Sequence, residues 1–147
     1  MKKAALAFAL ATASVLAMAQ QATPAGLWKT IDDDGKTEKS LVRIVNNGGV
    51  YSGKVEKVFD PAKQDAKCDK CEGAQQNQPV LGMTIIEGVK QDAEESNLFD
   101  GGKILDPNNG KTYKVRLTPA DGGKRLDVRG YIGAPLLGRT QTWIRAE

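Results

Sequence analysis

Residues 111–133, KTYKVRLTPADGGKRLDVRGYIG, hold two strand-like runs on either side of a turn. In the first run Tyr113, Val115 and Leu117 alternate with polar side chains, which is the two-residue period of a strand with one buried face. The turn at residues 120–123 is ADGG, and its two glycines can supply the positive φ that a tight reversal needs. The second run resumes the alternation, so the stretch predicts an antiparallel hairpin.

The same combination of a short apolar-alternating run and a turn rich in Asp, Asn and Gly recurs along the chain. About eight strands joined mostly by short links leave exposed sheet edges unless the sheet closes on itself. Eight strands give a barrel that is filled by side chains or holds one small ligand. We therefore predict an all-β fold, a small antiparallel up-and-down β-barrel, with a two-sheet sandwich as the alternative. The expected strands are residues 26–31, 37–45, 50–59, 80–89, 97–105, 111–118, 124–133 and 139–147.

The first residues have the layout of a secretory signal peptide. Lys2 and Lys3 precede an apolar run that ends in the small residues AMA, which predicts a signal peptide over residues 1–19 and export to the periplasm or beyond. The run is shorter than the ~20 residues of a spanning helix, which disfavours an uncleaved anchor. Residues 20–147 then form a single β-barrel domain. The two lysines carry most of the formal net charge of +3, so this domain is near neutral and has no general attraction for nucleic acid or anionic membranes.

The composition excludes several kinds of chemistry. The chain has no histidine, so it lacks His-dependent catalytic triads, His metal ligands and an imidazole base. We expect no metal and no cofactor, and the composition favours a binding protein over an enzyme. The apolar strand faces are too short for the outward band of a membrane-spanning barrel, so we expect no stable membrane insertion.

Cys68 and Cys71 are the chain's two cysteines, in the polar stretch of residues 60–79. In an oxidising compartment a disulfide between them is favoured, and the chain-entropy relation gives such a short loop about 2 kcal/mol. A zinc site would need more ligands than two sulfurs. A thiol–disulfide redox function stays open as the alternative, although the flanking sequence lacks the buried strand and helix of a thioredoxin-like site.

In the last strand, the sequence leaves open which side chains point into the barrel. Arg139, Gln141 and Trp143 share one face, so an inward Trp143 brings the guanidinium and the amide toward the interior. A buried charge must be paired, and an Arg fork suits a carboxylate. We hypothesise that the barrel binds a small amphiphilic or hydrophobic ligand. In its most specific form, the hypothesis is that Arg139 and Gln141 hold the anionic head of an amphiphile. The alternative hypothesis is a barrel filled by its own side chains that acts through a protein partner. The candidate ligand-binding residues are Arg139, Gln141, Trp143, Tyr113, Arg129 and Tyr131.

The order of motifs also carries a resemblance. Gly26-Leu27-Trp28 resembles the opening motif of lipocalins, in which the Trp closes one barrel end beneath a basic side chain of the last strand. That resemblance implies Trp28 and Arg145 as the closing pair. The series GLW, GGVYSGKV, CxxCEG, PVLGMTI, GGKILDPNNGKTY, LDVRGYIG and LLGRTQTWIR is similar to the bacterial domain-of-unknown-function family 2147, over residues 26 to 145. Phe99 departs from the Trp expected there. The resemblance implies a small exported lipocalin-like barrel and, since the family has no established activity, no specific function.

Overall fold

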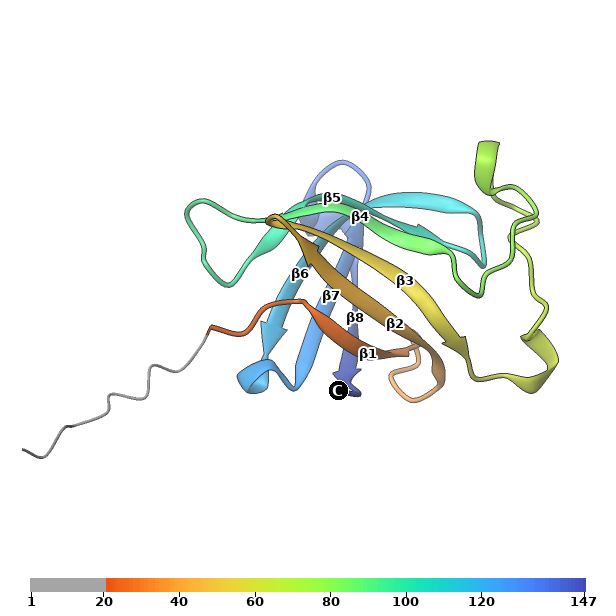
Figure 1. Cartoon of the computed structure of the whole chain (residues 1–147). Coiled ribbons are helices and arrows are strands. Elements are labelled where there is room, and N and C mark those ends of the chain that lie inside the picture. Colours follow the sequence, from red (N-terminus) through yellow and green to blue (C-terminus); the bar gives the residue numbers. More distant parts are fainter. Residues whose placement is uncertain (1–20) are drawn as a thin grey trace, which may run out of the picture.

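The computed structural model describes residues 21–147, and the expected signal peptide lies outside the described residues. Eight strands form its framework, which confirms the all-β prediction (Figure 1). None of the helices in residues 21–147 has the length and apolar character needed to cross a membrane. The strands are β1 (Gly26–Ile31), β2 (Glu38–Asn47), β3 (Val50–Val58), β4 (Thr84–Gln91), β5 (Phe99–Asp106), β6 (Lys111–Ala120), β7 (Arg125–Tyr131) and β8 (Arg139–Arg145). Short 3₁₀ turns lie in the connections: η1 (Pro61–Lys63), η2 (Gly73–Gln75), η3 (Asp121–Gly123) and η4 (Pro135–Leu137).

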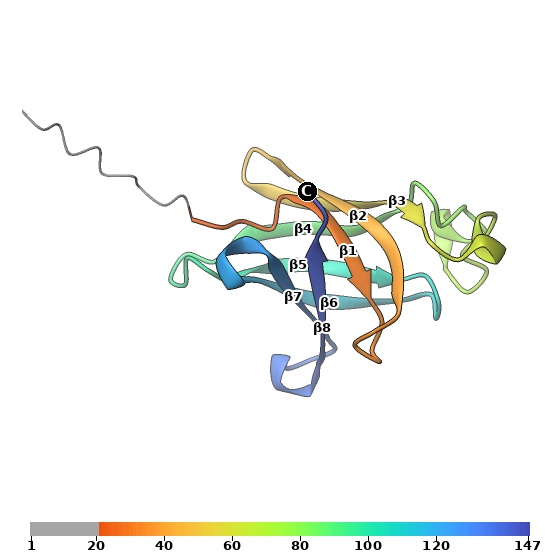
Figure 2. The ribbon, with the colours of Figure 1, turned by 90° about the horizontal axis from the view of Figure 1, so that it is seen from below.

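Each strand pairs with the next one along the chain, and β8 returns to pair with β1, which closes the sheet. The predicted up-and-down barrel of eight strands is therefore confirmed, and the two-sheet alternative is excluded. The closing seam between β1 and β8 is short, with Trp28 opposite Arg145 and Lys29 opposite Ile144 (Figure 2). Side-chain contacts therefore have to strengthen this seam.

The hairpin of β6 and β7 shows how the sequence pattern becomes a barrel wall. Leu117 lies opposite Val128, and both side chains are buried. Lys114 and Tyr131 lie opposite each other on the other face, where Lys114 is exposed. Successive side chains of a strand point to opposite faces, so the apolar set fills the interior and the charged set covers the outside.

All eight strands contribute to one interior cluster of apolar side chains. Phe99, at the position where a Trp was expected, is 1% exposed and packs edge-on against Tyr51, with the ring centres 5.2 Å apart. The family departure at this position therefore leaves the core filled. The other interior side chains include Trp28, Val42, Ile44, Val55, Ile86, Val89, Val115, Leu117, Leu126, Val128 and Trp143.

The strand expected at residues 80–89 begins later than the apolar pattern suggests, at Thr84. The Met83 N–H donates to the Val80 carbonyl at 3.1 Å, and Gly82 has φ +85°. These residues form a turn that ends the long β3–β4 connection. Backbone hydrogen bonds join Gly82 and Met83 to Val55 of β3, and Met83 is buried while Leu81 stays exposed.

Candidate functional site

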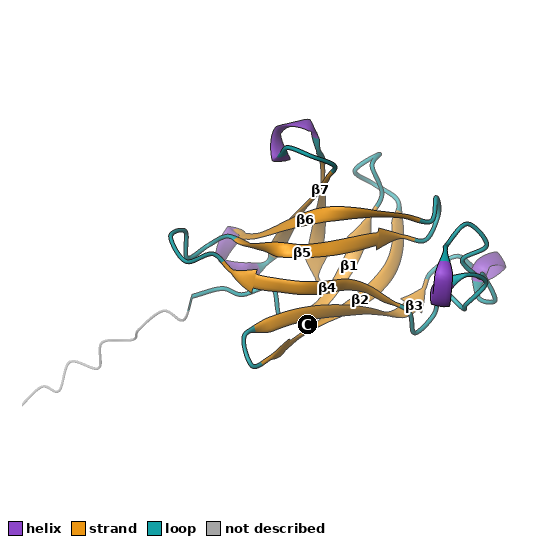
Figure 3. Cartoon of the chain, turned by 90° about the horizontal axis from the view of Figure 1, so that it is seen from above, coloured by secondary structure: helices purple, strands orange, loops and turns teal. Residues whose placement is uncertain are grey.

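Four connections meet at one end of the barrel, because alternate strands of an up-and-down barrel start or finish there. They are residues 32–37, 59–83, 107–110 and 132–138, and we call this the loop end. Figure 3 shows the β3–β4 connection, with its two helical turns, beside the ends of β3, β4 and β5. Because binding residues are concentrated on loops carried by a rigid scaffold, a binding site is expected at the loop end.

Burial along the barrel axis also directs attention to the loop end. In the middle of the barrel Val42 and Val115 are 0% exposed. Toward the loop end Ser40 and Ile104, both on the inward-facing register, are only partly buried. A protein interior at crystal-like density has no space for a ligand unless side chains move. A ligand of the folded barrel therefore meets the protein at its loop end.

Arg139 and Gln141 lie at this end, where they join β8 to the β1–β2 connection. Arg139 Nη1 is 3.1 Å from Asp33 Oδ2, and Arg139 Nη2 is 3.5 Å from Asp106 Oδ2. Gln141 Nε2 donates to Asp33 Oδ1 at 2.9 Å. In turn Gln141 Oε1 accepts a 3.0 Å hydrogen bond from the indole N–H of Trp143, which is 2% exposed. This chain of contacts supports the short β1–β8 seam at the loop end.

Trp143 therefore packs inward, while the guanidinium of Arg139, on the same strand face, reaches the rim. The Arg139 side chain is 57% exposed, so its ion pairs are surface pairs of modest strength. An anion from solution can reach this guanidinium, although it has to compete with Asp33 and Asp106.

The other three candidate ligand-binding residues divide between the two faces of the barrel wall. Tyr113 lies on the inward-facing register near the loop end, where its hydroxyl accepts a 2.9 Å hydrogen bond from Asn109 Nδ2. Arg129 and Tyr131 are on the outer face of β7, because Leu126 and Val128, on the alternate positions of the strand, are buried and point inward. The structure therefore brings Arg139, Gln141, Trp143 and Tyr113 together and separates Arg129 and Tyr131 from them.

The predicted disulfide between Cys68 and Cys71 is present and confirmed. It fixes the β3–β4 connection against the β5–β6 turn. Cys68 Sγ lies 3.5 Å from the Pro107 carbonyl oxygen, and a Cβ on Gly110 would lie 2.0 Å from the Lys70 carbonyl oxygen. The connection therefore lies directly against that turn, and only glycine fits at position 110.

Both sulfur-bearing residues are buried, Cys68 at 0% and Cys71 at 3% exposure. They belong to the same apolar cluster as Ile85 and Leu105. Thiol–disulfide exchange requires an attacking thiolate to reach a sulfur atom. The burial therefore gives no support to the redox alternative. Within residues 21–147, no group of three or more His, Cys, Asp or Glu is arranged to hold a metal ion.

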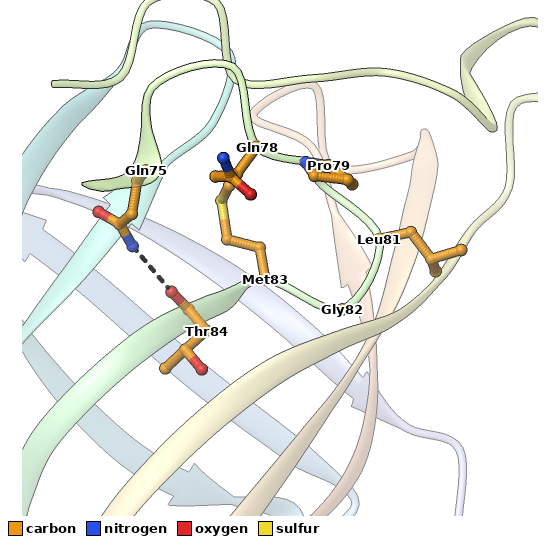
Figure 4. Close-up of a pocket in the computed structure, with 7 residues that line it drawn as sticks. All are labelled: Gln75, Gln78, Pro79, Leu81, Gly82, Met83 and Thr84. Atoms are coloured by element: carbon orange, nitrogen blue, oxygen red, sulfur yellow. Dashed lines mark hydrogen bonds between the residues drawn. The ribbon is translucent and has the colours of Figure 1, made fainter. Parts of the chain in front are cut away.

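A hollow of about 360 Å³ lies between the β3–β4 connection and the start of β4. Figure 4 shows Met83 pointing toward Gln78 across it, with Leu81 on the far side of the Gly82 turn. Gln75 Nε2 donates to the Thr84 carbonyl at 3.4 Å and ties η2 to the strand. The lining is Gln75, Gln78, Pro79, Leu81, Gly82, Met83 and Thr84, which contains no charged side chain.

A second hollow, of about 580 Å³, lies over the outer face of β2 and β3. Leu81 and Gly82 line both hollows, so the two adjoin at this turn. The second hollow carries the charges of Arg43, Lys54 and Glu56. The neutral hollow beside the β3–β4 connection and the charged hollow thus lie next to each other on the surface.

The β1–β2 connection, which presents Asp33, is held by its neighbour Asp34. The Asp34 carboxylate accepts hydrogen bonds from the Thr37 hydroxyl and from the N–H groups of Thr37 and Lys36, the latter two at 2.8 Å. The bond from the Thr37 hydroxyl, followed by those backbone bonds, lowers the pKa of Asp34 below its ordinary value. Hydrogen bonds to the ionised form have this effect because they stabilise the charge.

Residues 26–145 match the bacterial family described as "Uncharacterized protein conserved in bacteria (DUF2147)". The chain belongs to this family. Among solved structures it is similar to protein HP1028 from Helicobacter pylori, described as belonging to the lipocalin family. The TM-score is 0.73 at 21% identity, over 86% of this chain and 85% of that one, which shows a shared lipocalin-like fold. A comparison with curated proteins finds no match.

For this DUF2147 chain, sequence reasoning missed the hollow beside the β3–β4 connection and the role of Asp33. Residues 75–84 contain side-chain amides, the turn residues Pro79 and Gly82, and the apolar residues Leu81 and Met83. The sequence pattern predicts a polar loop up to residue 79 and a strand from residue 80. A signal was present in Leu81 and Met83, since these apolar residues directly follow a polar stretch. The aspartate run that includes Asp33 is turn chemistry by its pattern, and only the closed barrel shows which carboxylate meets Arg139.

Proposed function

We propose that this protein is an exported barrel that binds a small amphiphilic ligand at its loop end without transforming it. The observation that carries the proposal is the hollow of about 360 Å³ between the β3–β4 connection and the start of β4. Ligand pockets are concave, at least partly apolar and usually exceed ~300 Å³, with a few polar groups that fix orientation. The lipocalin-like fold is compatible with this function, since its barrels hold one small ligand.

The chemistry of the lining indicates the part of the ligand that the hollow would hold. Leu81, Met83 and Pro79 offer apolar contact, and Gln75, Gln78 and Thr84 offer amides and a hydroxyl. A charged group would gain no ion pair among these residues. The hollow therefore suits an apolar segment with neutral polar substituents.

For an anionic head we propose the guanidinium of Arg139, with Gln141 as the second donor. The ligand's carboxylate would replace Asp33, which sits in an exposed connection and is held by surface contacts. A carboxylate can bind an Arg fork through both of its oxygens, whereas Asp33 contacts Arg139 through Oδ2 alone and accepts from Gln141 at Oδ1. The ligand would in this way exchange one ion pair for another rather than create a buried charge.

Two probes, dodecanoate and the neutral monolaurin, test the site and the head group separately. Titration calorimetry with delipidated protein should show binding of both. Leu81→Asp places a charge at the hollow and should weaken both by about tenfold or more, ~1.4 kcal/mol. Ile144→Asp is the matched control, because Ile144 is 40% exposed and Leu81 44%, and Ile144 is absent from both hollow linings.

Arg139→Leu should weaken dodecanoate about tenfold and leave monolaurin unchanged, whereas Asp33→Asn should strengthen dodecanoate. If Leu81→Asp binds both probes as well as wild type does, the hollow is not the site. Native mass spectrometry of protein from its own periplasm adds a direct check. The function itself is wrong if wild type binds neither probe and retains no small molecule.

A further inference from the structure

The β7–β8 connection carries three large apolar side chains that the barrel leaves uncovered. Ile132 is 66% exposed, Leu136 87% and Leu137 78%. Figure 1 shows this connection standing clear of the barrel wall at the top of the view, and Figure 3 shows it projecting beyond β7. Single exposed apolar residues are ordinary, but three on one projecting connection concentrate the kind of apolar surface that interaction sites use.

The connection is held in this position by Arg129 on the outer face of β7. Arg129 Nε donates to the Pro135 carbonyl at 2.7 Å, and Nη2 donates to the Leu136 carbonyl at 3.2 Å. Its Nη1 also donates to Thr140 Oγ1 at 2.8 Å. These bonds fix the backbone of the projecting connection to β7 and β8, so that the two leucines are presented by an anchored backbone. We call Ile132, Leu136 and Leu137 the apolar tip.

The sheet beside the apolar tip brings like charges opposite each other. Lys103 lies opposite Lys114 in β5 and β6, and Arg116 lies opposite Arg129 in β6 and β7. Like charges directly opposite on neighbouring strands destabilise a sheet. The nearest acids compensate weakly, with Lys103 Nζ 3.6 Å from Glu87 and Arg116 Nε 3.9 Å from Asp100. We call these four cations the basic surface.

This surface belongs to an asymmetric distribution of charge over a nearly neutral domain. Residues 99–147 contain nine Lys and Arg against five Asp and Glu, whereas residues 21–98 contain ten against thirteen. Positive charge is therefore concentrated in the half of the barrel that carries the apolar tip. A local field of this kind attracts an anionic partner even where the net charge is small.

We propose that the apolar tip and the basic surface dock the protein on an anionic lipid membrane. The tip would enter the boundary between head groups and acyl chains, as interfacial anchors do, while the cations contact anionic head groups. Tyr131, opposite Lys114 on the outer face, would lie at head-group level, where aromatic side chains are enriched. A symmetric dimer through the same face would set the basic surface against itself, which favours the membrane over a second copy.

Docking goes beyond the proposed ligand binding, and it has a consequence for that function. The apolar tip lies in residues 132–138, one of the four connections of the loop end. A docked protein would therefore hold its loop end close to the bilayer. Such a position suits a protein that takes an amphiphile from a membrane or delivers one to it.

Flotation with lipid vesicles tests the docking directly. The protein is recovered from the periplasm after its own processing and mixed with vesicles of phosphatidylcholine alone or with one quarter phosphatidylglycerol. Binding to the anionic vesicles should be about tenfold tighter or more and should weaken as salt is raised, because exposed charges are screened. Leu136→Ser/Leu137→Ser should reduce that binding about tenfold or more. Lys114→Gln/Arg116→Gln should reduce it about fivefold or more.

The control is Lys90→Gln/Lys124→Gln, which removes the same charge from two exposed lysines outside the basic surface and should change binding less than about twofold. Circular dichroism and thermal melting establish that each variant is folded, and because all the substituted tip residues are exposed, folding should be unaffected. The proposal is overturned if wild type binds vesicles with and without phosphatidylglycerol equally, or if the tip variant binds anionic vesicles as tightly as wild type does. Self-association in sedimentation without vesicle binding would overturn it and assign the tip to a second copy of the chain. Absence of binding in both assays would also overturn it and would leave another protein as the partner of the tip. Probe binding by the hollow is measured without vesicles, so the two proposals fail independently.

Discussion

The guanidinium carbon of Arg145 lies 4.3 Å from the centre of the Trp28 indole, so the last strand covers a side chain of the first. Arg145 also donates from Nε to the Gly123 carbonyl at 2.5 Å and from Nη1 to the Ala25 carbonyl at 3.1 Å. Trp28 is 0% exposed and donates its own N–H to the Pro24 carbonyl at 2.7 Å. These contacts tie the β6–β7 connection and the segment before β1 to the closing seam. At the other end of the barrel, Asp33 and Arg139 support the same seam.

Arg145→Lys should lower the free energy of unfolding by about 1–2 kcal/mol, because an ammonium cannot lie flat on the indole and reach both carbonyls. Urea denaturation measures the loss. Arg125→Lys serves as the control, since Arg125 is exposed in β7 and should tolerate the change within about 0.5 kcal/mol. Equal stability of both variants would show that the Arg145 contacts contribute nothing beyond backbone pairing.

Cys68→Ala/Cys71→Ala should lower stability by about 2 kcal/mol and leave the barrel folded, because the disulfide closes a short loop outside the strand framework. Cleavage by a protease should become faster within residues 59–83 and stay unchanged elsewhere. Binding in the hollow should weaken in parallel, since backbone hydrogen bonds join Cys68 to Asn77 and to Gln78, and Gln78 lines the hollow. Cooperative unfolding of the whole barrel in this variant would contradict the assigned role.

Gly102→Ala should be more damaging than Gly101→Ala, although the two positions are adjacent. A Cβ on Gly102 would lie 2.2 Å from the Glu87 carbonyl oxygen and 2.7 Å from the Val89 nitrogen, both backbone atoms of β4. We expect a loss of about 2 kcal/mol or more, because the strand pairing must shift. Gly101 has φ +79° with open space around its Cβ position, so Ala there costs about 1 kcal/mol of backbone strain. Thermal melting of the two variants decides the order, and a reversed order would be inconsistent with the close approach of β4 and β5.

Thr37→Val should raise the pKa of Asp34 toward its ordinary value, because the hydroxyl bond that contributes most to the lowered pKa is lost. A carboxyl whose pKa is lowered by folding contributes stability above its unfolded pKa, and that contribution is lost as the pH falls through the folded pKa. As the pH falls below about 4, the variant should therefore lose the stability contributed by ionised Asp34 at a higher pH than wild type does. NMR titration of the Asp34 side chain gives the pKa directly. An unchanged pKa would assign the shift to the backbone N–H groups alone.

The strands and their inward faces could be predicted from the sequence because they are local properties. The alternation of Val115 and Leu117 with Lys114 and Arg116 sets one face of β6 toward the interior whatever its neighbours are. Eight such runs with short turns leave few arrangements without open edges, so barrel closure followed as well. The spacing of Cys68 and Cys71 likewise allowed the disulfide, since three residues of chain bring the two sulfurs together without help from the fold.

The tertiary structure alone decided what surrounds each functional candidate. Alternation placed Arg139 on the same face as Trp143. Only the closed barrel shows that this face reaches the rim, where Arg139 meets Asp33 across the seam, 106 residues earlier in the chain. Leu81 and Met83 have strand-like composition, yet the turn at Gly82 makes them the wall of a hollow. Leu136 and Leu137 are apolar enough for a core, and the bonds from Arg129 hold them in solvent instead. Burial, ion pairing and cavity shape depend on residues far apart in the chain, so a local pattern cannot fix them.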